Sequence, residues 1–321
     1  FARFAPWCPD LGRWLATTEE RFDLVAAMNI VFEPFTAAGL DFARRRQVPF
    51  VTFPLTHLGA GPAPGEDPPS RFYTMRHQVD LVRRSAAVAA QTPTEQRFYT
   101  SHGVDPARIR VIGAGVNPDE VLGGEGERFR QHYGIDGPLV AFLSAMAYDK
   151  GAVTTVEAVR LLWAAGRDVH LVLAGSLMTP FRRYLDGLPA NERTRLLVLP
   201  GIAEADKRDL LAACDLLAMP SRVDSFGIVY LEAWLYRKPV IGAQSWGIGD
   251  VITQGADGLL VPFGGEKALA DAIARLLDDP ILAERMGRHG EAKVYQSHTW
   301  AQKAAQVEAL YRELVGLSTS L

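Results

Sequence analysis

The sequence predicts an α/β protein built from two doubly wound parallel sheets. Short apolar segments alternate with amphipathic segments of helical length, which is the pattern of repeated strand–helix–strand units. The strand Leu139 to Leu143, a helix from about Ala152 to Ala165 and the strand Val169 to Ala174 show this alternation. With 321 residues, of which 48% are hydrophobic and 22% charged, the chain is long enough to bury two cores.

The remaining strands are predicted from short apolar runs bounded by turn-forming or polar residues. Because helical segments rather than tight turns separate these runs, we expect parallel sheets. The predicted strands are Leu24 to Ala27, Phe50 to Thr52, Ala87 to Ala90, Ile109 to Ile112, Leu196 to Leu199, Leu216 to Met219, Pro239 to Ile241 and Gly258 to Val261.

The domain boundary is expected near residue 117, because the polar segment Pro118 to Glu127 has the composition of a linker. The Gly- and Pro-rich stretch Gly59 to Pro69 is predicted to be a flexible loop over a cleft. A closing helix, Trp300 to Val315, carries an apolar stripe suited to packing across an interface. Its members are Ala304, Val307, Leu310, Tyr311 and Leu314.

Composition excludes several classes of function. A net charge of -3 and a pI near 6.2 provide no overall basic field for nucleic acid. No apolar run approaches the roughly 18 residues of a membrane helix. Cys8 and Cys214 are far apart, so we expect no disulfide and a buried free thiol at Cys214. These features indicate a cytoplasmic protein, although a segment preceding Phe1 would not be visible.

One segment, from Pro220 to Ala233, has the chemistry of a site. Pro220 ends an apolar strand, and residues 225–227 are predicted to open a helix that runs to about Leu235. Helix-start amides and the helix dipole favour an anion such as a nucleotide phosphate. Glu232, two turns into the helix, could accept both hydroxyls of a ribose, and Asp224 could reach a sugar hydroxyl. The alternative is that Asp224 or Ser225 is only a helix cap and Glu232 a solvated residue.

This segment resembles the paired-acid signature of the retaining glycosyltransferases of family 4, with Asp224 in place of the first Glu. Other stretches resemble the same family in the same order, and together they extend over roughly residues 22 to 317. They are PFVT (49–52) with His57, RVIGAGVN (110–117), DKG (149–151), LAG (173–175), PVIG (239–242), WGIGDVI (246–252) and DGLLVP (257–262).

The resemblance implies the GT-B fold, which consists of two Rossmann-like domains. Residues 1–117 would form the acceptor-side domain, joined by a returning helix at 299–317, and residues 118–298 the donor domain. The family's N-terminal domain usually begins with further strand–helix units, including a Gly-rich loop, before anything resembling residues 22–25. We therefore expect this domain to be partial, with any peripheral membrane contact confined to the missing part.

The resemblance also assigns the site. The residues expected at the reaction centre are Lys150, Asp224 and His57. Those expected to bind the donor are Glu232, Ser225, Phe226, Gly227, Ile228, Gly201, Ile202, Ser176, Gly247 and Arg222, with Asp250 an uncertain companion.

Lys150 follows a strand and enters a helix, where a flexible ammonium can reach the oxygens of a leaving diphosphate. Taken alone it reads as a surface lysine. The family usually has an Arg five residues earlier, where this chain has Ala145, so one five-donor group is missing. Among the arginines that could substitute, Arg222 ranks ahead of Arg182 and Arg183.

His57 is expected in the loop after a strand, where open α/β sheets bind their ligands. In the family such a His approaches the transferred sugar. The alternative for His57 is a loop histidine whose ring is satisfied by backbone groups.

The expected function is transfer of a hexose or similar sugar from a nucleotide-diphosphate sugar to a sugar, lipid or small-molecule acceptor, with retention of configuration. No metal or other cofactor is expected, since the sequence has neither an Asp-x-Asp motif nor a Cys/His cluster. Two alternatives remain: an inactive nucleotide-sugar binding protein, and a sugar-nucleotide epimerase on the same fold.

Overall fold

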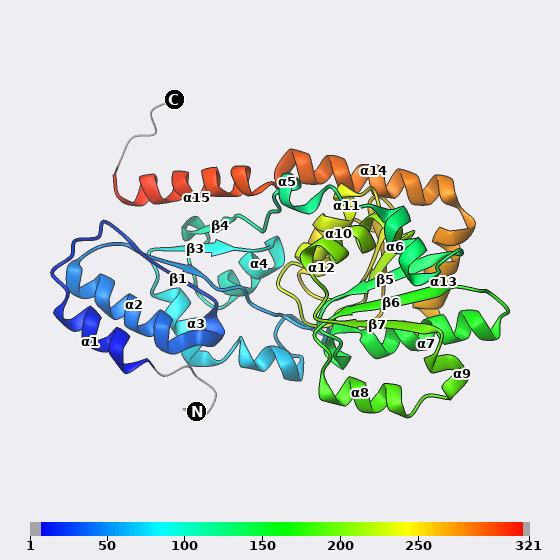
Figure 1. Cartoon of the computed structure of the whole chain (residues 1–321). Coiled ribbons are helices and arrows are strands. Elements are labelled where there is room, and N and C mark those ends of the chain that lie inside the picture. Colours follow the sequence, from blue (N-terminus) through cyan, green and yellow to red (C-terminus); the bar gives the residue numbers. More distant parts are fainter. Residues whose placement is uncertain (1–7, 317–321) are drawn as a thin grey trace. The chain divides into compact units, whose positions relative to one another are not determined.

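The computed structural model describes residues 8–316 and divides into two compact α/β units (Figure 1). The first contains the described residues up to Ala114, the three residues Asp224–Phe226, and the chain from Ala301 onward. The second contains Gly115–Val223 and Gly227–Trp300. Each unit has a parallel sheet of its own, so the predicted fold class is confirmed.

The first unit has a four-stranded parallel sheet in the order β1-β2-β3-β4. Its strands are β1 (Val25–Met28), β2 (Phe50–Phe53), β3 (Ala87–Ala90) and β4 (Ile109–Val111). Its helices are α1 (Pro9–Thr17), η1 (Ile30–Phe32), α2 (Glu33–Arg46), η2 (Pro68–Phe72), α3 (Arg76–Arg83), α4 (Pro93–Ser101), η3 (Pro106–Arg108) and, from its second residue, α15 (Trp300–Leu314).

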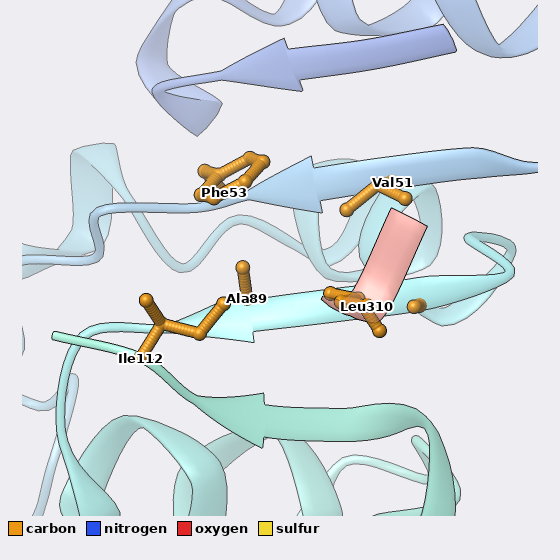
Figure 2. Close-up of a cluster of buried hydrophobic side chains, with 6 residues drawn as sticks. Val51, Phe53, Ala89, Ile112 and Leu310 are labelled. Carbon is orange, nitrogen blue, oxygen red and sulfur yellow. The ribbon is translucent and has the colours of Figure 1, made fainter. Parts of the chain in front are cut away.

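The closing helix α15 completes the core of this first sheet. Leu310 belongs to one buried cluster with Val51 and Phe53 of β2 and Ala89 of β3 (Figure 2). Burial of such a side chain stabilises the fold by about 1.5 to 3 kcal/mol. Val307, Tyr311 and Leu314 of the predicted apolar stripe pack against the same cluster, whereas Ala304, also predicted to belong to the stripe, is exposed.

The second unit has a six-stranded parallel sheet in the order β10-β9-β8-β5-β6-β7. Its strands are β5 (Leu139–Leu143), β6 (His170–Gly175), β7 (Leu196–Pro200), β8 (Leu216–Met219), β9 (Val240–Ala243) and β10 (Gly258–Val261). Its helices are α5 (Pro118–Val121), α6 (Gly126–Tyr133), η4 (Tyr148–Lys150), α7 (Ala152–Ala164), α8 (Thr179–Asp186), α9 (Ala190–Arg193), α10 (Glu204–Ala213), α11 (Ile228–Leu235), α12 (Ile248–Val251), α13 (Glu266–Asp278) and α14 (Pro280–Ser297).

Helices cover both faces of this second sheet (Figure 1). Helix α7 packs with α8 and α13, while the pairs α6–α10 and α11–α14 form the other layer. Strands β5, β6 and β7 succeed one another in one direction, and β8, β9 and β10 succeed one another in the opposite direction from β5. The winding therefore reverses between β5 and β8, and in open parallel sheets ligands bind at the carboxyl ends of the strands that flank such a reversal.

All predicted strands are present, with ends that differ by at most two residues. The predicted start of the helix at residues 225–227 was wrong, because α11 begins at Ile228. Gly227 precedes it with a left-handed backbone, φ 83°, and an added Cβ would lie 2.4 Å from the ring of Tyr230. Glu232 is consequently the fifth residue of the helix, little more than one turn from its start.

The segment Pro118 to Glu127, predicted to be a linker, contains α5 and the start of α6. Asn117 caps α5 by accepting from the Asp119 amide, and Asp209 of α10 accepts from the Glu125 amide at 2.7 Å. The composition resembled a linker because the polar residues serve as caps and anchors. This segment is therefore part of the second unit.

The stretch Gly59 to Pro69, predicted to be a flexible loop, contains no helix or strand before η2, which begins at Pro68, and it is held by its own hydrogen bonds. The buried carboxylate of Asp67 accepts from the Ala60 amide at 2.9 Å, and the Gly65 amide donates to the Leu58 carbonyl at 2.9 Å. Among residues 8–316, no helix combines the length and the apolar content that crossing a bilayer requires.

Candidate functional site

The carboxyl edge of the second sheet carries most of the predicted donor residues. Lys150, Ser176, Gly201 and Gly247 follow β5, β6, β7 and β9, and residues 220–223 follow β8. Hydrogen bonds link neighbouring loops along this edge: the Met146 amide donates to the Ser176 carbonyl at 2.8 Å, and the Gly201 amide to the Gly175 carbonyl at 3.1 Å. The structure thus places these loops at the same edge, although they are far apart in sequence.

The loops after β5 and β8 are joined at the point where the winding reverses. The ammonium of Lys150, at the end of η4, donates to the Val223 carbonyl at 2.8 Å. The Asp149 carbonyl accepts from the Arg222 amide at 2.8 Å. A Cβ at Gly151 would lie 2.5 Å from the Pro220 carbonyl oxygen, so only glycine allows this close approach. Lys150 therefore lies beside the segment that leads into α11.

Arg222 brings a second positive charge to this edge. Its guanidinium lies 3.7 Å from an Asp149 carboxylate oxygen and 5.4 Å from the centre of the Phe263 ring. Tyr148, which is exposed, packs edge-on against the same ring. Ala145 stands in the loop after β5, so no guanidinium projects from the position where the related family has one. Arg222 is thus a cation on the loop after the neighbouring strand.

The start of α11 presents amides of different residues from those predicted. Since the helix begins at Ile228, its first-turn amides are those of Ile228 and Val229, and the Tyr230 amide donates to the Gly227 carbonyl. The Tyr230 hydroxyl donates to the Met219 carbonyl at 2.6 Å, which fastens the helix to the end of β8. Ile228 is 44% exposed, so this turn of the helix is accessible.

Glu232 lies in a sheltered position on α11, with its side chain 15% exposed. One carboxylate oxygen accepts from the Lys207 ammonium of α10 at 3.2 Å, so Glu232 is not a solvated helix residue. Burial raises the pKa of Glu232, while the charge of Lys207 opposes that rise. The same ammonium lies 2.7 Å from the exposed carboxylate of Glu204.

Gly201 and Ile202 form the turn between β7 and α10. Gly201 is exposed, has φ 66° and would meet no atom with an added Cβ. Gly247 precedes α12 and is buried, with φ 97°. Ser176 is exposed directly after β6. Each of these residues lies in the loop that directly follows its strand, so its backbone amide and carbonyl are at the carboxyl edge of the sheet.

In the first unit, His57 lies in the loop four residues after the end of β2. Its ring stacks on Tyr73, with ring centres 4.2 Å apart and planes inclined by 18°. The preceding residue is anchored: the Thr56 amide donates to Glu95 at 2.7 Å, and the Thr56 hydroxyl lies 2.7 Å from that of Tyr99. The position of His57 is therefore set by an aromatic neighbour and by a buried hydrogen-bond network.

Residues Asp224–Phe226 cluster with this first unit. Burial first, and the negative charge of Asp224 second, raise the pKa of Tyr73. Phe226 is buried beside Gly113, where an added Cβ would lie 3.1 Å from its ring. Asp224 and Ser225 are half-buried. The contiguous sequence motif 220–233 is thus divided between two units, which its sequence did not indicate.

Three residues of these surroundings were not found from the sequence: Lys207, Tyr73 and Glu95. Glu95 had a signal, because Thr92-Pro93-Thr94-Glu95 is a helix-start pattern, and Thr92 does cap α4. No sequence pattern indicated Lys207 or Tyr73, because each contacts a partner that is distant in sequence.

Comparison with known proteins agrees with this arrangement. Residues 126–293, more than half of the chain, match the family model described as "Glycosyl transferases group 1", and residues 1–115 match "Glycosyl transferase 4-like domain". The chain belongs to the glycosyltransferases of this family.

Two relatives illustrate the relationship. The chain is 31% identical over 258 residues to the D-inositol 3-phosphate glycosyltransferase of Corynebacterium glutamicum. This alignment covers 74% of this chain and 60% of the relative. It is 28% identical over 253 residues to the alpha-D-kanosaminyltransferase of Streptomyces kanamyceticus, covering 77% and 64%. The chain thus spans less than two thirds of the length of these relatives.

Solved structures share the fold. Anabaena Alr3699/HepE in complex with UDP superposes with a TM-score of 0.81 at 22% identity, covering 95% of this chain and 82% of that one. Sucrose-phosphate synthase from Thermosynechococcus elongatus gives a TM-score of 0.74 at 22% identity, covering 92% and 75%. Both confirm the two-domain GT-B architecture.

Proposed function

We propose that this chain carries the donor site of an enzyme that transfers a sugar from a nucleoside-diphosphate sugar to an acceptor. The observation that carries the proposal is the reversal of the second sheet between β5 and β8. At the carboxyl ends of these two strands lie the Lys150 ammonium and the segment leading into α11. A cation and helix-start amides are the groups that a leaving diphosphate requires.

In this proposal each group of the donor has a partner in the second unit. Lys150 and the amides of Ile228 and Val229 hold the diphosphate, with Arg222 contributing positive charge in place of the missing arginine at Ala145. Glu232 accepts from the ribose hydroxyls. The Gly201–Ile202 turn offers backbone groups to the base, and Ser176 and Gly247 line the phosphate side.

The first unit is proposed to serve the acceptor and the reacting sugar. His57 and Asp224 are the polar groups assigned to the transferred sugar. We further propose transfer with retention and without a metal, since Lys150 and the helix amides already oppose the charge that develops on the diphosphate. A reducing, cytoplasmic location is proposed from the two free thiols of Cys8 and Cys214.

The UDP and UDP-glucose complexes of Anabaena Alr3699/HepE favour a uridine donor for the first experiment. We would screen UDP-, GDP-, ADP- and dTDP-sugars by thermal shift, and then measure nucleoside diphosphate release with and without acceptor sugars. Stabilisation by one nucleotide class and acceptor-dependent release are the expected results. Absence of stabilisation by all four classes would overturn the proposed donor site.

A second candidate, an inactive nucleotide-sugar binding protein, is motivated by Ala145 and Asp224, which replace the arginine and the first glutamate of the related family. It predicts the same thermal stabilisation with no release of nucleotide for any acceptor. Conversion of the donor sugar without acceptor would instead indicate an epimerase.

The donor assignment of Glu232 is tested by Glu232→Gln. Loss of a charged acceptor is expected to weaken binding of the stabilising nucleotide by about tenfold or more, since hydrogen bonds to charged groups contribute about 1.5 to 3 kcal/mol. An unchanged dissociation constant by calorimetry would reject the ribose assignment. The matched control is Glu291→Gln, which removes a carboxylate of α14 that is paired with Arg237, a residue of the loop after α11.

A further inference from the structure

The ion pair between Lys207 and Glu232 connects the two helices that follow β7 and β8. Lys207 is the fourth residue of α10, and its ammonium lies 3.2 Å from Oε1 of Glu232 and 2.7 Å from Oε2 of Glu204. The side chains of Lys207 and Glu232 are 18% and 15% exposed, whereas that of Glu204 is 80% exposed. One sheltered cation is thus shared by a sheltered carboxylate and a solvated one.

A sheltered carboxylate without a cation would favour its protonated form, because burial disfavours the charged state. A protonated Glu232 has fewer acceptor positions for sugar hydroxyls. Lys207 counters this effect, and it also fixes the orientation of the carboxylate by occupying Oε1. Among the described residues, none donates a hydrogen bond to Oε2 of Glu232, the oxygen that Lys207 leaves unoccupied.

From this geometry we propose that Lys207 is a positioning residue of the donor site. It orients Glu232 and keeps it ionised, so that Oε2 can accept from the ribose of a nucleoside diphosphate. The inference rests on the proposed ribose role of Glu232. According to this inference, Lys207 of α10 affects donor affinity through Glu232, without itself contacting the donor.

The charged groups around Glu232 are few and opposed. From α10 it faces Lys207 and Glu204. From the C-cap of its own helix it faces Tyr236, whose hydroxyl donates to the carbonyl of Val121, the last residue of α5. Helix α14 packs on the side of α11 that carries Trp234, where Lys293 lies over the indole. Residues 232 and 234 point to opposite sides of a helix, so Lys207 is the cation that faces Glu232 in the described chain.

The test uses the nucleoside diphosphate, among UDP, GDP, ADP and dTDP, that stabilises the wild-type protein most. Calorimetry should show affinity for it reduced about tenfold in Lys207→Met and largely restored in Lys207→Arg, which keeps the charge. Glu204→Gln is the matched control. It removes the competing carboxylate and leaves Lys207 to Glu232, so affinity should stay equal or improve. Thermal unfolding of each variant reports whether the fold is retained.

The pH dependence separates positioning from a merely structural role. Affinity should fall as pH decreases through the pKa of Glu232, because the protonated carboxyl is the weaker acceptor. Since Lys207 opposes the burial-induced rise of that pKa, the fall should begin at a higher pH in Lys207→Met than in the wild type. Glu232→Gln should lack this component, and the double variant should bind no more weakly than Glu232→Gln alone.

The outcomes distinguish the two proposals. If Glu232→Gln weakens binding while folded Lys207→Met binds like the wild type at every pH, the role of Lys207 is wrong and the donor site stands. If neither variant changes the affinity, or the wild type binds none of the four nucleotides, the proposed function fails and the role of Lys207 with it. A pH profile of Lys207→Met that overlays the wild type would also overturn the inference.

Discussion

The Lys150 ammonium and the Val223 carbonyl oxygen are 2.8 Å apart, in a hydrogen bond that joins the loop after β5 to the loop after β8. These two strands flank the reversal of the second sheet. A flexible ammonium that donates to a neutral carbonyl can donate instead to anionic phosphate oxygens, with which it forms a stronger bond. In the proposed function, this ammonium would stay with a diphosphate as its negative charge grows.

Lys150→Met should lower the turnover number about 100-fold, a typical loss for an electrostatic group at a developing charge. Donor affinity should fall less than turnover, because the charge is needed most in the transition state. Initial rates with varied donor concentration measure both quantities, and Lys150→Arg should retain part of the activity. A loss of affinity with an unchanged turnover number would mean that Lys150 binds the ground state and the transition state alike.

The stack of His57 on Tyr73 gives a prediction for the first unit. Tyr73→Leu should lower kcat/KM about 2- to 10-fold, because an aromatic pair contributes about 0.5 to 1.5 kcal/mol to the position of the ring. Tyr73→Phe keeps the ring face and should remain close to the wild type. If Phe and Leu at this position had the same effect, the phenol hydroxyl rather than the stack would be responsible.

Two glycines with positive φ provide a matched test of packing near the site. Gly201→Ala meets no neighbouring atom, so only the backbone preference should destabilise the protein, by about 1 to 2 kcal/mol. Gly227→Ala has a similar φ but places its Cβ 2.4 Å from the Tyr230 ring, which should add about 1 to 3 kcal/mol. Urea unfolding measures both free energies. Equal destabilisation would show that the Tyr230 ring yields at no cost.

The two thiols should differ sharply in reactivity. Burial, the largest cause, raises the pKa of Cys214 to about 11, whereas Cys8 is exposed. Near pH 8 a thiol reagent should modify Cys8 in the native protein and Cys214 only after unfolding. The stabilising contribution of the protonated Cys214 thiol should be lost as pH rises through about 11, because the unfolded chain ionises at lower pH. Rapid native labelling of both thiols would contradict this burial.

The sequence alone determined the alternating strands and helices, and it predicted a site at the ends of strands. Apolar runs such as Leu139–Leu143 predict strands because a parallel sheet covered on both faces buries every residue, and this strand is fully buried. Pro220 likewise marked the end of β8. The helix start was misplaced at residues 225–227 because Gly227 adopts a left-handed conformation that ends the loop rather than opening the helix.

Only the tertiary structure decided which residues stand together. The order of strands in the sheet depends on how the helices and strands pack, so the reversal between β5 and β8 cannot be predicted from the sequence of either strand. Two contacts join residues that are distant in sequence: Lys207 pairs with Glu232, and His57 stacks on Tyr73. The residues next to each partner in the sequence do not predict these contacts. Local propensity acts over a few residues, whereas burial and charge pairing act through space, and these contacts belong to the second kind.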